Sequence, residues 1–324
     1  MAARAGVAIS SVSRVLSDHP DVSAEMRAKV MGAVEDLGYR PDMLAQSMRR
    51  QKTLSVGFAA SDISNPVLAE TITGAERAFS AAGYSMLVTD AEGDPALDVA
   101  RIDALIQRRV DGLLLSPSDE RDPDTLELLR SLEIPFVLVD RYRPRGVRAP
   151  EVRFDHRRGM AAAARHLWEL GHRRVALIVG GPRRPADERR EAVEEVFGAE
   201  GQLTILAGPY TIEHGRNATS EALAAPEPPT AIIAAANLFM HGALRTLRDR
   251  GLVLGRDISF VGCDDVAVAE FHDPPIALVR RDTRRIGNVA ARVLLAALDA
   301  GPEVPRAELM LPTDFVPQPS CAPV

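Results

Sequence analysis

The stretch AGVAISSVSRVLSDHPDVSAEMRAKVMGAVEDLG, residues 5–38, contains helical patterns and no strand pattern. The spacing of its apolar residues predicts one short helix over 10–16 and a longer one over 24–37. Ser23 stands where an N-cap is needed before the longer helix, and Gly38 stands where a C-cap is favoured after it. These signals predict a small helical unit at the start of the chain.

From Leu54 onward, short apolar runs alternate with amphipathic helical stretches. The runs are LSVGFAA (54–60), YSMLVTD (84–90), GLLLS (112–116), FVLVD (136–140), RVALIVGG (174–181), LTILAG (203–208), AIIAAAN (231–237) and ISFVGCDD (258–265). Strands that are apolar throughout and separated by helices indicate parallel sheets covered on both faces. Two such sets predict two similar lobes that join near Phe154 and Asp155. Ligands of such open sheets bind beyond the carboxyl ends of the strands.

Composition excludes several classes of protein. The 324 residues are 46% hydrophobic and 26% charged, and the net charge is −6. No apolar run approaches the roughly 20 residues of a membrane span, and no signal-peptide pattern opens the chain. Two cysteines, Cys263 and Cys321, make no disulfide framework, so we expect a cytosolic protein. The histidines lack metal-ligand spacing and no catalytic arrangement stands out, so we expect no metal site, no cofactor and no enzyme.

Residues 5–49 closely resemble the headpiece of the lactose-repressor (LacI/GalR) family. The resemblance rests on the Ala-Gly-Val turn at 5–7, Val-Ser-Arg-Val at 12–15 and Leu-Gly-Tyr-x-Pro at 37–41. Later motifs agree, including Asp-Ile-Ser-Asn-Pro at 62–66 and Val-Gly-Cys-Asp-Asp at 261–265. The resemblance covers nearly the whole chain. It implies an α/β fold in which an N-terminal helix-turn-helix headpiece precedes a two-lobed periplasmic-binding-protein-like domain with parallel sheets.

The same resemblance implies the domain bounds. The headpiece would span 1–40, with its first helix truncated, and a hinge helix and linker would span 41–53. The effector-binding domain would span 54–324. Its lobe one would comprise 54–153 and about 284–312, and its lobe two 154–283 and about 313–324.

Two sets of site residues follow from the resemblance. Those expected to contact DNA are Ile9, Ser10, Ser11, Ser13, Arg14, Ser17, Met48 and Arg49. Met48 in particular is expected to insert as a wedge into the minor groove. Those expected to bind the effector are Ser61, Asp62, Asn65, Asp140, Arg141, Arg189, Asn237 and Asp264. Carboxylates and guanidinium groups that converge in a cleft suit a polyhydroxylated ligand such as a sugar.

The chain departs from the family pattern at four places. Most of the first helix is missing, so we expect the true N-terminus to lie upstream of Met1. Ala8 replaces a serine that usually caps the second helix, and Ala236-Asn237 replaces the usual Asn-Asp. The loop at 183–188 is one residue short, so the choice of Arg189 over Arg190 is an alignment judgement. We also expect His172 to lie at the surface, where it precedes a strand.

The leading interpretation is a dimeric, effector-gated repressor that binds operator DNA as a homodimer and does not associate with membranes. The helices near 67–79 and 96–105 would form the dimer interface, and the proline-rich C-terminus predicts no further assembly. A sugar-binding protein of a transport system shares the two-lobed fold and remains the alternative. An enzyme on an α/β scaffold is a third interpretation.

Overall fold

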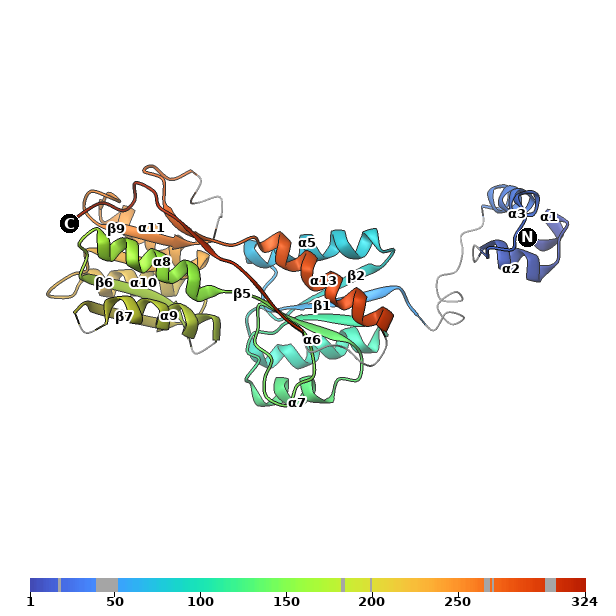
Figure 1. Ribbon diagram of the computed structural model, residues 1–324, viewed down its shortest axis with the longest axis horizontal. Coiled ribbons are helices and arrows are strands. Elements are labelled where there is room, and N and C mark those ends of the chain that lie inside the picture. The colour runs from blue at the N-terminus through green and yellow to red at the C-terminus, as the bar shows by residue number, and fades with distance from the viewer. Residues whose placement is uncertain are drawn as a thin grey trace. The chain divides into compact units, whose positions relative to one another are not determined.

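The computed structural model describes residues 1–16, 19–38, 52–181, 184–198, 200–264, 269, 271–300 and 307–324 (Figure 1). The chain divides into two compact units, Met1–Thr53 and Leu54–Val324. No helix in these ranges is both long enough and apolar enough to cross a bilayer.

The described residues of the first unit form three helices around a small apolar core. They are α1 (Ala2–Ala5), α2 (Ile9–Leu16) and α3 (Ala24–Asp36). Val12 and Val15 of α2 pack against Val30 of α3, and residues of α1 cover the same cluster. The expected capping by Ser23 is confirmed, because its side chain accepts a hydrogen bond from the backbone N–H of Met26.

The turn between α1 and α2 depends on Gly6. This residue has φ 65° and returns its N–H to the carbonyl of Ala2, so it ends α1 in a left-handed conformation. A residue with a Cβ is strained there. The tight turn therefore brings α1 and α2 together on one side of α3.

The second unit is built on two six-stranded sheets with helices on both faces. One sheet has the strand order β11-β5-β4-β3-β1-β2, and we call the part built on it lobe one. The other sheet has the order β12-β10-β9-β8-β6-β7, and the part built on it is lobe two. The strands of lobe one are β1 (Ser55–Ala60), β2 (Ser85–Asp90), β3 (Gly112–Ser116), β4 (Phe136–Val139), β5 (Glu151–Phe154) and β11 (Glu308–Leu311). Those of lobe two are β6 (Arg174–Gly180), β7 (Gln202–Gly208), β8 (Ala231–Ala234), β9 (Ser259–Cys263), β10 (Ala277–Arg280) and β12 (Asp314–Val316).

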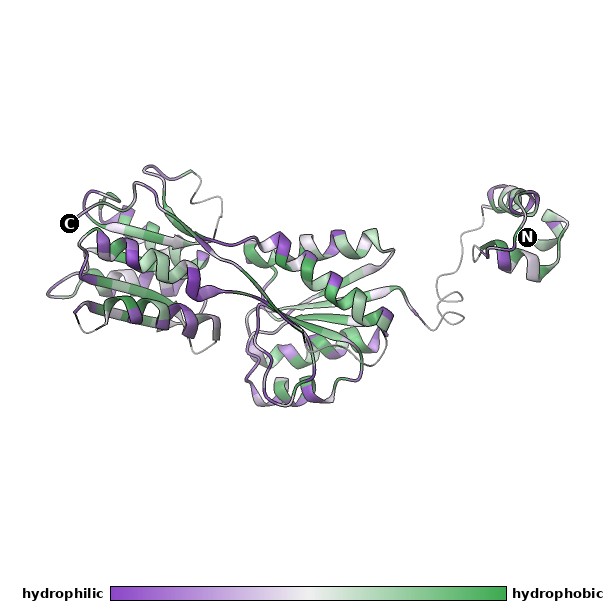
Figure 2. Ribbon diagram, viewed as in Figure 1, coloured by the Kyte–Doolittle hydropathy of each residue, from purple (hydrophilic) through white to green (hydrophobic). Residues whose placement is uncertain are grey.

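Helices cover both sheets, so the central strands, which are apolar (Figure 2), are buried. The edge strands β2 and β7 are largely exposed. In lobe one, α5 (Pro66–Ala81) and α13 (Thr283–Ala300) cover one face, and α6 (Pro95–Gln107) and α7 (Pro123–Ser131) cover the other. In lobe two, α10 (Ile212–Leu223) and α11 (Asn237–Asp249) lie opposite α8 (His156–Glu169) and α9 (Arg184–Phe197). The parallel sheets expected from the sequence are confirmed, with one antiparallel exception among the described strands, β10 beside β12.

Helices α5 and α13 cross at unusually short range because glycines face each other's backbone. A Cβ on Gly287 of α13 would stand 1.9 Å from the carbonyl oxygen of Thr71 on α5. A Cβ on Gly74 of α5 would stand 2.0 Å from the carbonyl oxygen of Arg284. Neither backbone can yield locally, so this contact requires glycine.

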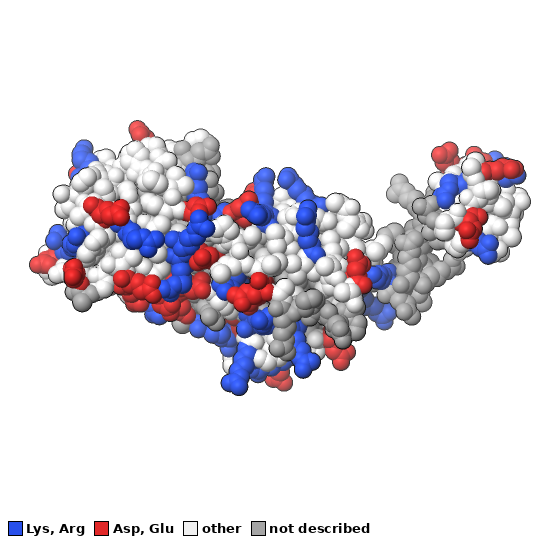
Figure 3. All heavy atoms as spheres, viewed as in Figure 1, with Lys and Arg blue, Asp and Glu red and all other residues white. Residues whose placement is uncertain are grey.

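The outer faces of the helices carry charged residues (Figure 3). Arg157 on α8, for example, forms an ion pair with Glu191 on α9 at 2.9 Å.

The described chain passes between the lobes at three places. These crossovers are at Asp155 between β5 and α8, at Arg281–Asp282 between β10 and α13, and at Pro312–Thr313 between β11 and β12. Buried Thr313 ties two of them together. Its Oγ1 accepts a hydrogen bond from the N–H of Gly159 (2.9 Å) and donates one to the carbonyl of Asp155 (2.6 Å).

Several details differ from the sequence-based expectations. The short strands β5, β10, β11 and β12 had not been expected, and β8 ends at Ala234, so Asn237 begins helix α11 and does not end a strand. The expectation that His172 lies at the surface is wrong. Its ring is buried and bonds Thr230 (2.8 Å) and Ser259 (2.9 Å), because the C-terminal segment covers it through the carbonyl of Ala322.

Candidate functional site

A cavity of about 420 Å³ lies between the two lobes, beyond the carboxyl ends of the central strands. All eight residues expected to bind the effector line it: Ser61, Asp62, Asn65, Asp140, Arg141, Arg189, Asn237 and Asp264. The structure thus brings together side chains from eight positions that are spread over about two hundred residues of sequence. The volume falls within the range usual for small-molecule sites.

Lobe one supplies a wall of fixed polar groups. Asn65 caps helix α5 by accepting a hydrogen bond from the N–H of Val67 (3.1 Å), and Asp62 is held by the N–H of Ser64 (2.9 Å). Arg141 is buried, and its guanidinium donates to the carbonyl of Pro117 (2.7 Å). These bonds fix the side chains before a ligand arrives, so binding costs little conformational entropy.

Lobe two supplies the opposing wall. Arg189 on α9 is buried and donates to the carbonyl of Ala235 (2.7 Å). The next residue, Arg190, is partly exposed and lies near Asp187 and Glu194 on its own helix. It is therefore Arg189, and not Arg190, that lines the cavity.

A direct hydrogen bond between two asparagines joins the walls of the cavity. Asn237, the first residue of α11, donates from its Nδ2 to the Oδ1 of Asn65 at 3.0 Å. Because these residues belong to different lobes, the bond is sensitive to any relative movement of the lobes.

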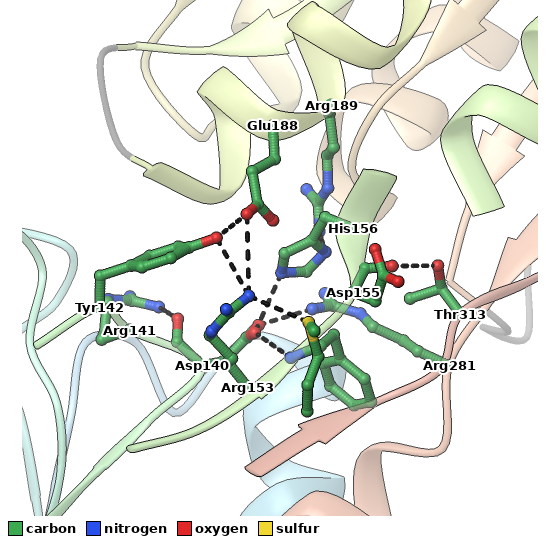
Figure 4. Close-up of polar contacts among 12 residues, drawn as sticks. Asp140, Arg141, Tyr142, Arg153, Asp155, His156, Glu188, Arg189, Arg281 and Thr313 are labelled. Carbon is green, nitrogen blue, oxygen red and sulfur yellow. Dashed lines mark hydrogen bonds and ion pairs between the residues drawn. The ribbon is translucent and has the colours of Figure 1, made fainter. Parts of the chain in front are cut away.

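Arg281 is a cavity residue that sequence reasoning missed. It lies in the crossover after β10, and its guanidinium spans two carboxylates, those of Asp264 and Asp140. Figure 4 shows its contact with Asp140. Its Nε donates to Asp264 (2.5 Å) and its NH1 donates to Asp140 (2.7 Å). Asp140 and Asp264 both have positive φ, 51° and 73°, which is uncommon for residues other than glycine and occurs often at functional sites. One signal could have pointed to Arg281: two acids expected in one cavity require a cation nearby to compensate their charge.

The electrostatics of this cluster follow from its contacts. Burial would raise the pKa of Asp140, but His156 and Arg281 outweigh burial and hold that pKa well below its usual range. Burial likewise opposes ionisation of Asp264, and Arg281 overcomes it, so the pKa of Asp264 is also lowered. The two aspartates are therefore carboxylates at neutral pH.

His156 is neutral in this cluster. Burial lowers its pKa to about 4. The hydrogen bonds agree, because Arg189 donates to Nδ1 (3.1 Å), which leaves Nε2 as the donor toward Asp140 (3.0 Å). Behind the cavity, burial raises the pKa of Cys263 to about 12, so its thiol is not a nucleophile at neutral pH.

A second polar cluster lies between the lobes at Glu188, which sequence reasoning also missed. Its carboxylate, on α9, accepts a hydrogen bond from the hydroxyl of Tyr142 in lobe one, and the guanidinium of Arg153 is 3.7 Å away. Burial and the nearby charge of Asp140 raise the pKa of Glu188 to about 7. Figure 4 shows this cluster beside the Asp140–Arg281 cluster.

In the headpiece, α2 separates a buried face from an exposed one. Val12 and Val15 are buried, whereas Ile9 is 80% exposed and Ser10 and Arg14 are exposed. Ser11 and Ser13 are half-buried. The other expected DNA contacts, Ser17, Met48 and Arg49, lie outside the described residues, as does the hinge segment 41–51.

The fold and the cavity define a class of protein: a two-lobed domain with a cavity between its lobes, which follows a helix-turn-helix headpiece in the chain. Residues 1–42 match the model of bacterial regulatory proteins of the lacI family, and residues 164–321 match the periplasmic binding protein-like domain. The chain is 33% identical to the HTH-type transcriptional regulator MalR of Streptomyces coelicolor over 99% of this chain and 95% of MalR.

Two solved structures extend the comparison. The Lac repressor dimer bound to operator and the anti-inducer ONPF has a TM-score of 0.86 and 25% identity, and the match covers 99% of this chain and 97% of that one. The transcriptional regulator CelR in complex with cellobiose has a TM-score of 0.73 and 30% identity, with 98% of each chain covered. The chain belongs to the lacI family and is a DNA-binding transcriptional regulator.

Proposed function

We propose that this regulator is a repressor whose binding to operator DNA is controlled by a small polyhydroxylated effector, such as a sugar, held in the interlobe cavity. The observation that carries the proposal is the convergence of the eight expected effector residues on one cavity of about 420 Å³. The carboxylates, amides and guanidinium groups that line it can both accept and donate hydrogen bonds, as each hydroxyl of such a ligand requires. CelR was solved with cellobiose, which supports a sugar as the class to test first.

The contacts between the lobes suggest how an effector acts. A ligand that bonds both walls competes with the Asn237–Asn65 hydrogen bond and favours one arrangement of the lobes over another. Movement is expected at the three crossovers, and the one at Arg281–Asp282 contributes Arg281 to the cavity wall. A ligand can shift such an equilibrium only by its difference in affinity for the two arrangements. Contacts made to both lobes at once provide that difference.

The headpiece supplies the DNA contacts in this proposal. The exposed face of α2, with Ile9, Ser10 and Arg14, would enter the major groove, and its buried face would hold it against α3. Two copies would bind the two halves of a symmetric operator, with the dimer formed through helices α5 and α6. Met48 and Arg49 would contact the minor groove. We place the protein in the cytoplasm with the DNA and assign it no enzymatic activity.

Two consecutive arginines on α9 allow a matched test of the effector site. Arg189→Ala removes a buried cavity residue, whereas Arg190→Ala removes the neighbouring arginine that lies outside the cavity. We expect the first change to weaken effector binding by about 10- to 150-fold, which corresponds to one lost charge-assisted hydrogen bond. We expect the second change to have little effect.

Gel-shift titrations measure the response, with maltose and cellobiose as the first neutral sugars and an operator selected from random DNA. Both variants should bind operator like the parent when no sugar is present. Arg14→Ala should show the reverse pattern, with operator binding lost and sugar binding kept. If Arg189→Ala responds to the sugar as the parent does, the cavity is not the effector site.

A further inference from the structure

The charged groups in the depth of the cavity are balanced against one another. The carboxylates of Asp140 and Asp264 both bond Arg281, whose side chain is only 9% exposed. Arg141 is paired from behind by Glu120, which is 3.7 Å away and buried. Arg189 has the neutral His156 as its side-chain partner and lies close enough to Asp264 to lower that residue's pKa. Three arginines therefore face three carboxylates.

The mouth of the cavity adds no excess of positive charge. Its carboxylates are those of Asp62, Glu92 and Asp119. Arg101 lies 3.8 Å from Glu92, and Arg121 lies 3.8 Å from Asp119. Summed over the depth and the mouth, the cavity therefore offers an anionic ligand no excess of positive charge, and a cationic ligand would find the deepest carboxylates already bonded to Arg281.

Arg281 compensates two carboxylates at once, because its single guanidinium bonds acids from different lobes. Asp140 follows β4 of lobe one, and Asp264 follows β9 of lobe two. The fork geometry of guanidinium allows one side chain to bond both carboxylates at once. The guanidinium also lies over the ring of Phe154, 5.2 Å from its centroid, which fixes its position.

We propose that Arg281 is the residue that sets the charge preference of the cavity: by neutralising Asp140 and Asp264 together, it makes the cavity select uncharged polyhydroxylated ligands over amines and phosphate esters. The inference rests on the proposed function, since it specifies the class of effector for the same cavity. Arg281 acts here as a specificity-determining residue. If Arg281 had only a structural role in the crossover, its replacement would lower the stability of the protein but would not change whether the cavity prefers cations or anions.

Charge-changing substitutions test the proposal with simple sugars as probes, so the natural effector need not be identified first. Arg281→Gln leaves an uncompensated carboxylate, so it should shift the preference toward cations. Asp264→Asn leaves an uncompensated guanidinium, so it should shift the preference toward anions. The double variant, with both substitutions, restores the balance and should behave like the parent. Arg256→Gln, which removes an exposed arginine paired with Asp257 outside the cavity, is the matched control.

The probes are glucose, glucosamine and glucose 6-phosphate at equal concentration and ionic strength at pH 6. Calorimetric titration and the shift in melting temperature of the full-length protein report binding. For Arg281→Gln we expect glucosamine to bind about tenfold more tightly than glucose 6-phosphate, which corresponds to about 1.4 kcal/mol, and for Asp264→Asn the reverse. The parent, the double variant and the control should favour neither charged probe over glucose.

The proposal is overturned if the two single variants shift the preference in the same direction, or if neither differs from the parent. If Arg281→Gln fails to fold, Asp264→Asn and the double variant still decide the matter, because the first should prefer glucose 6-phosphate and the second should prefer neither charged probe. Gel shifts in parallel separate this result from the proposed function. If no sugar changes the operator binding of the parent, the proposed control by an effector is refuted. The opposite charge preferences of Arg281→Gln and Asp264→Asn are measured by sugar binding, so they test the role of Arg281 independently.

Discussion

Replacing Thr313 by valine should weaken the hinge of the two-lobed unit by a calculable amount. The side chain is 1% exposed and lies at the third crossover. Its hydroxyl satisfies the N–H of Gly159 at 2.9 Å and the carbonyl of Asp155 at 2.6 Å. Valine has nearly the same shape but neither donates nor accepts, so the buried N–H of Gly159 and the part-buried carbonyl of Asp155 would lose this partner. Each such loss costs about 1–3 kcal/mol, and we expect about 2–4 kcal/mol in all.

Urea unfolding monitored by fluorescence provides the assay, because the chain's single tryptophan, Trp168, lies on α8, the helix that also holds Gly159. For a domain of this size the loss corresponds to a fall of roughly 4–7 °C in melting temperature. Thr204→Val makes the same chemical change at an exposed position on edge strand β7 and should alter stability by less than about 0.5 kcal/mol. If Thr313→Val is as stable as this control, the hydroxyl does not hold the crossovers together.

Three further predictions concern packing, titration and capping. Gly287→Ala should destabilise the second unit by about 1–3 kcal/mol in thermal melts, because its Cβ would collide with the Thr71 carbonyl, whereas Gly32→Ala on α3, with nothing within 4 Å, should be neutral or stabilising. Burial raises the pKa of Glu188 from 4.5 to about 7, so the parent should lose about 3 kcal/mol of stability relative to Glu188→Gln as pH rises through that window; equal pH profiles would disprove the shift. Ser23→Ala should cost the headpiece about 1 kcal/mol in circular dichroism melts, and an unchanged melt would show that the cap contributes nothing.

Local patterns in the sequence were sufficient for most of the fold. Apolar runs such as LSVGFAA at 54–60 became central strands because burial on both faces demands continuous hydrophobicity. Strand β5, EVRF at 151–154, has no such run, and it forms because β4 and β11 pair with it on either side. Such short strands owe their existence to tertiary pairing, which no local pattern encodes.

The cavity residues likewise divide into those that local sequence patterns could predict and those that only tertiary contacts bring into place. Acids that follow apolar strands, such as Asp140, could be placed because parallel strands end at one edge of a sheet. Arg281 could not, since it follows the short strand β10 and gains its role only when two distant carboxylates meet around it. Glu188 lies in a run of charged residues on α9 that resembles a solvated surface until Tyr142 of the other lobe meets it.

The three crossovers also bear on how the protein is made. Lobe one receives its last helix, α13, and its edge strand β11 from the C-terminal part of the chain, after almost all of lobe two has been synthesised. Until then α5 alone covers its face of the first sheet, because α13, the helix that packs against Gly74 and Thr71, is encoded more than two hundred residues later. Contacts at such sequence separation slow folding and leave apolar surface open to chaperones and proteases during translation. A ribosome that stops before α13 therefore releases a chain with neither lobe complete, so the cell obtains a whole regulator or a substrate for degradation.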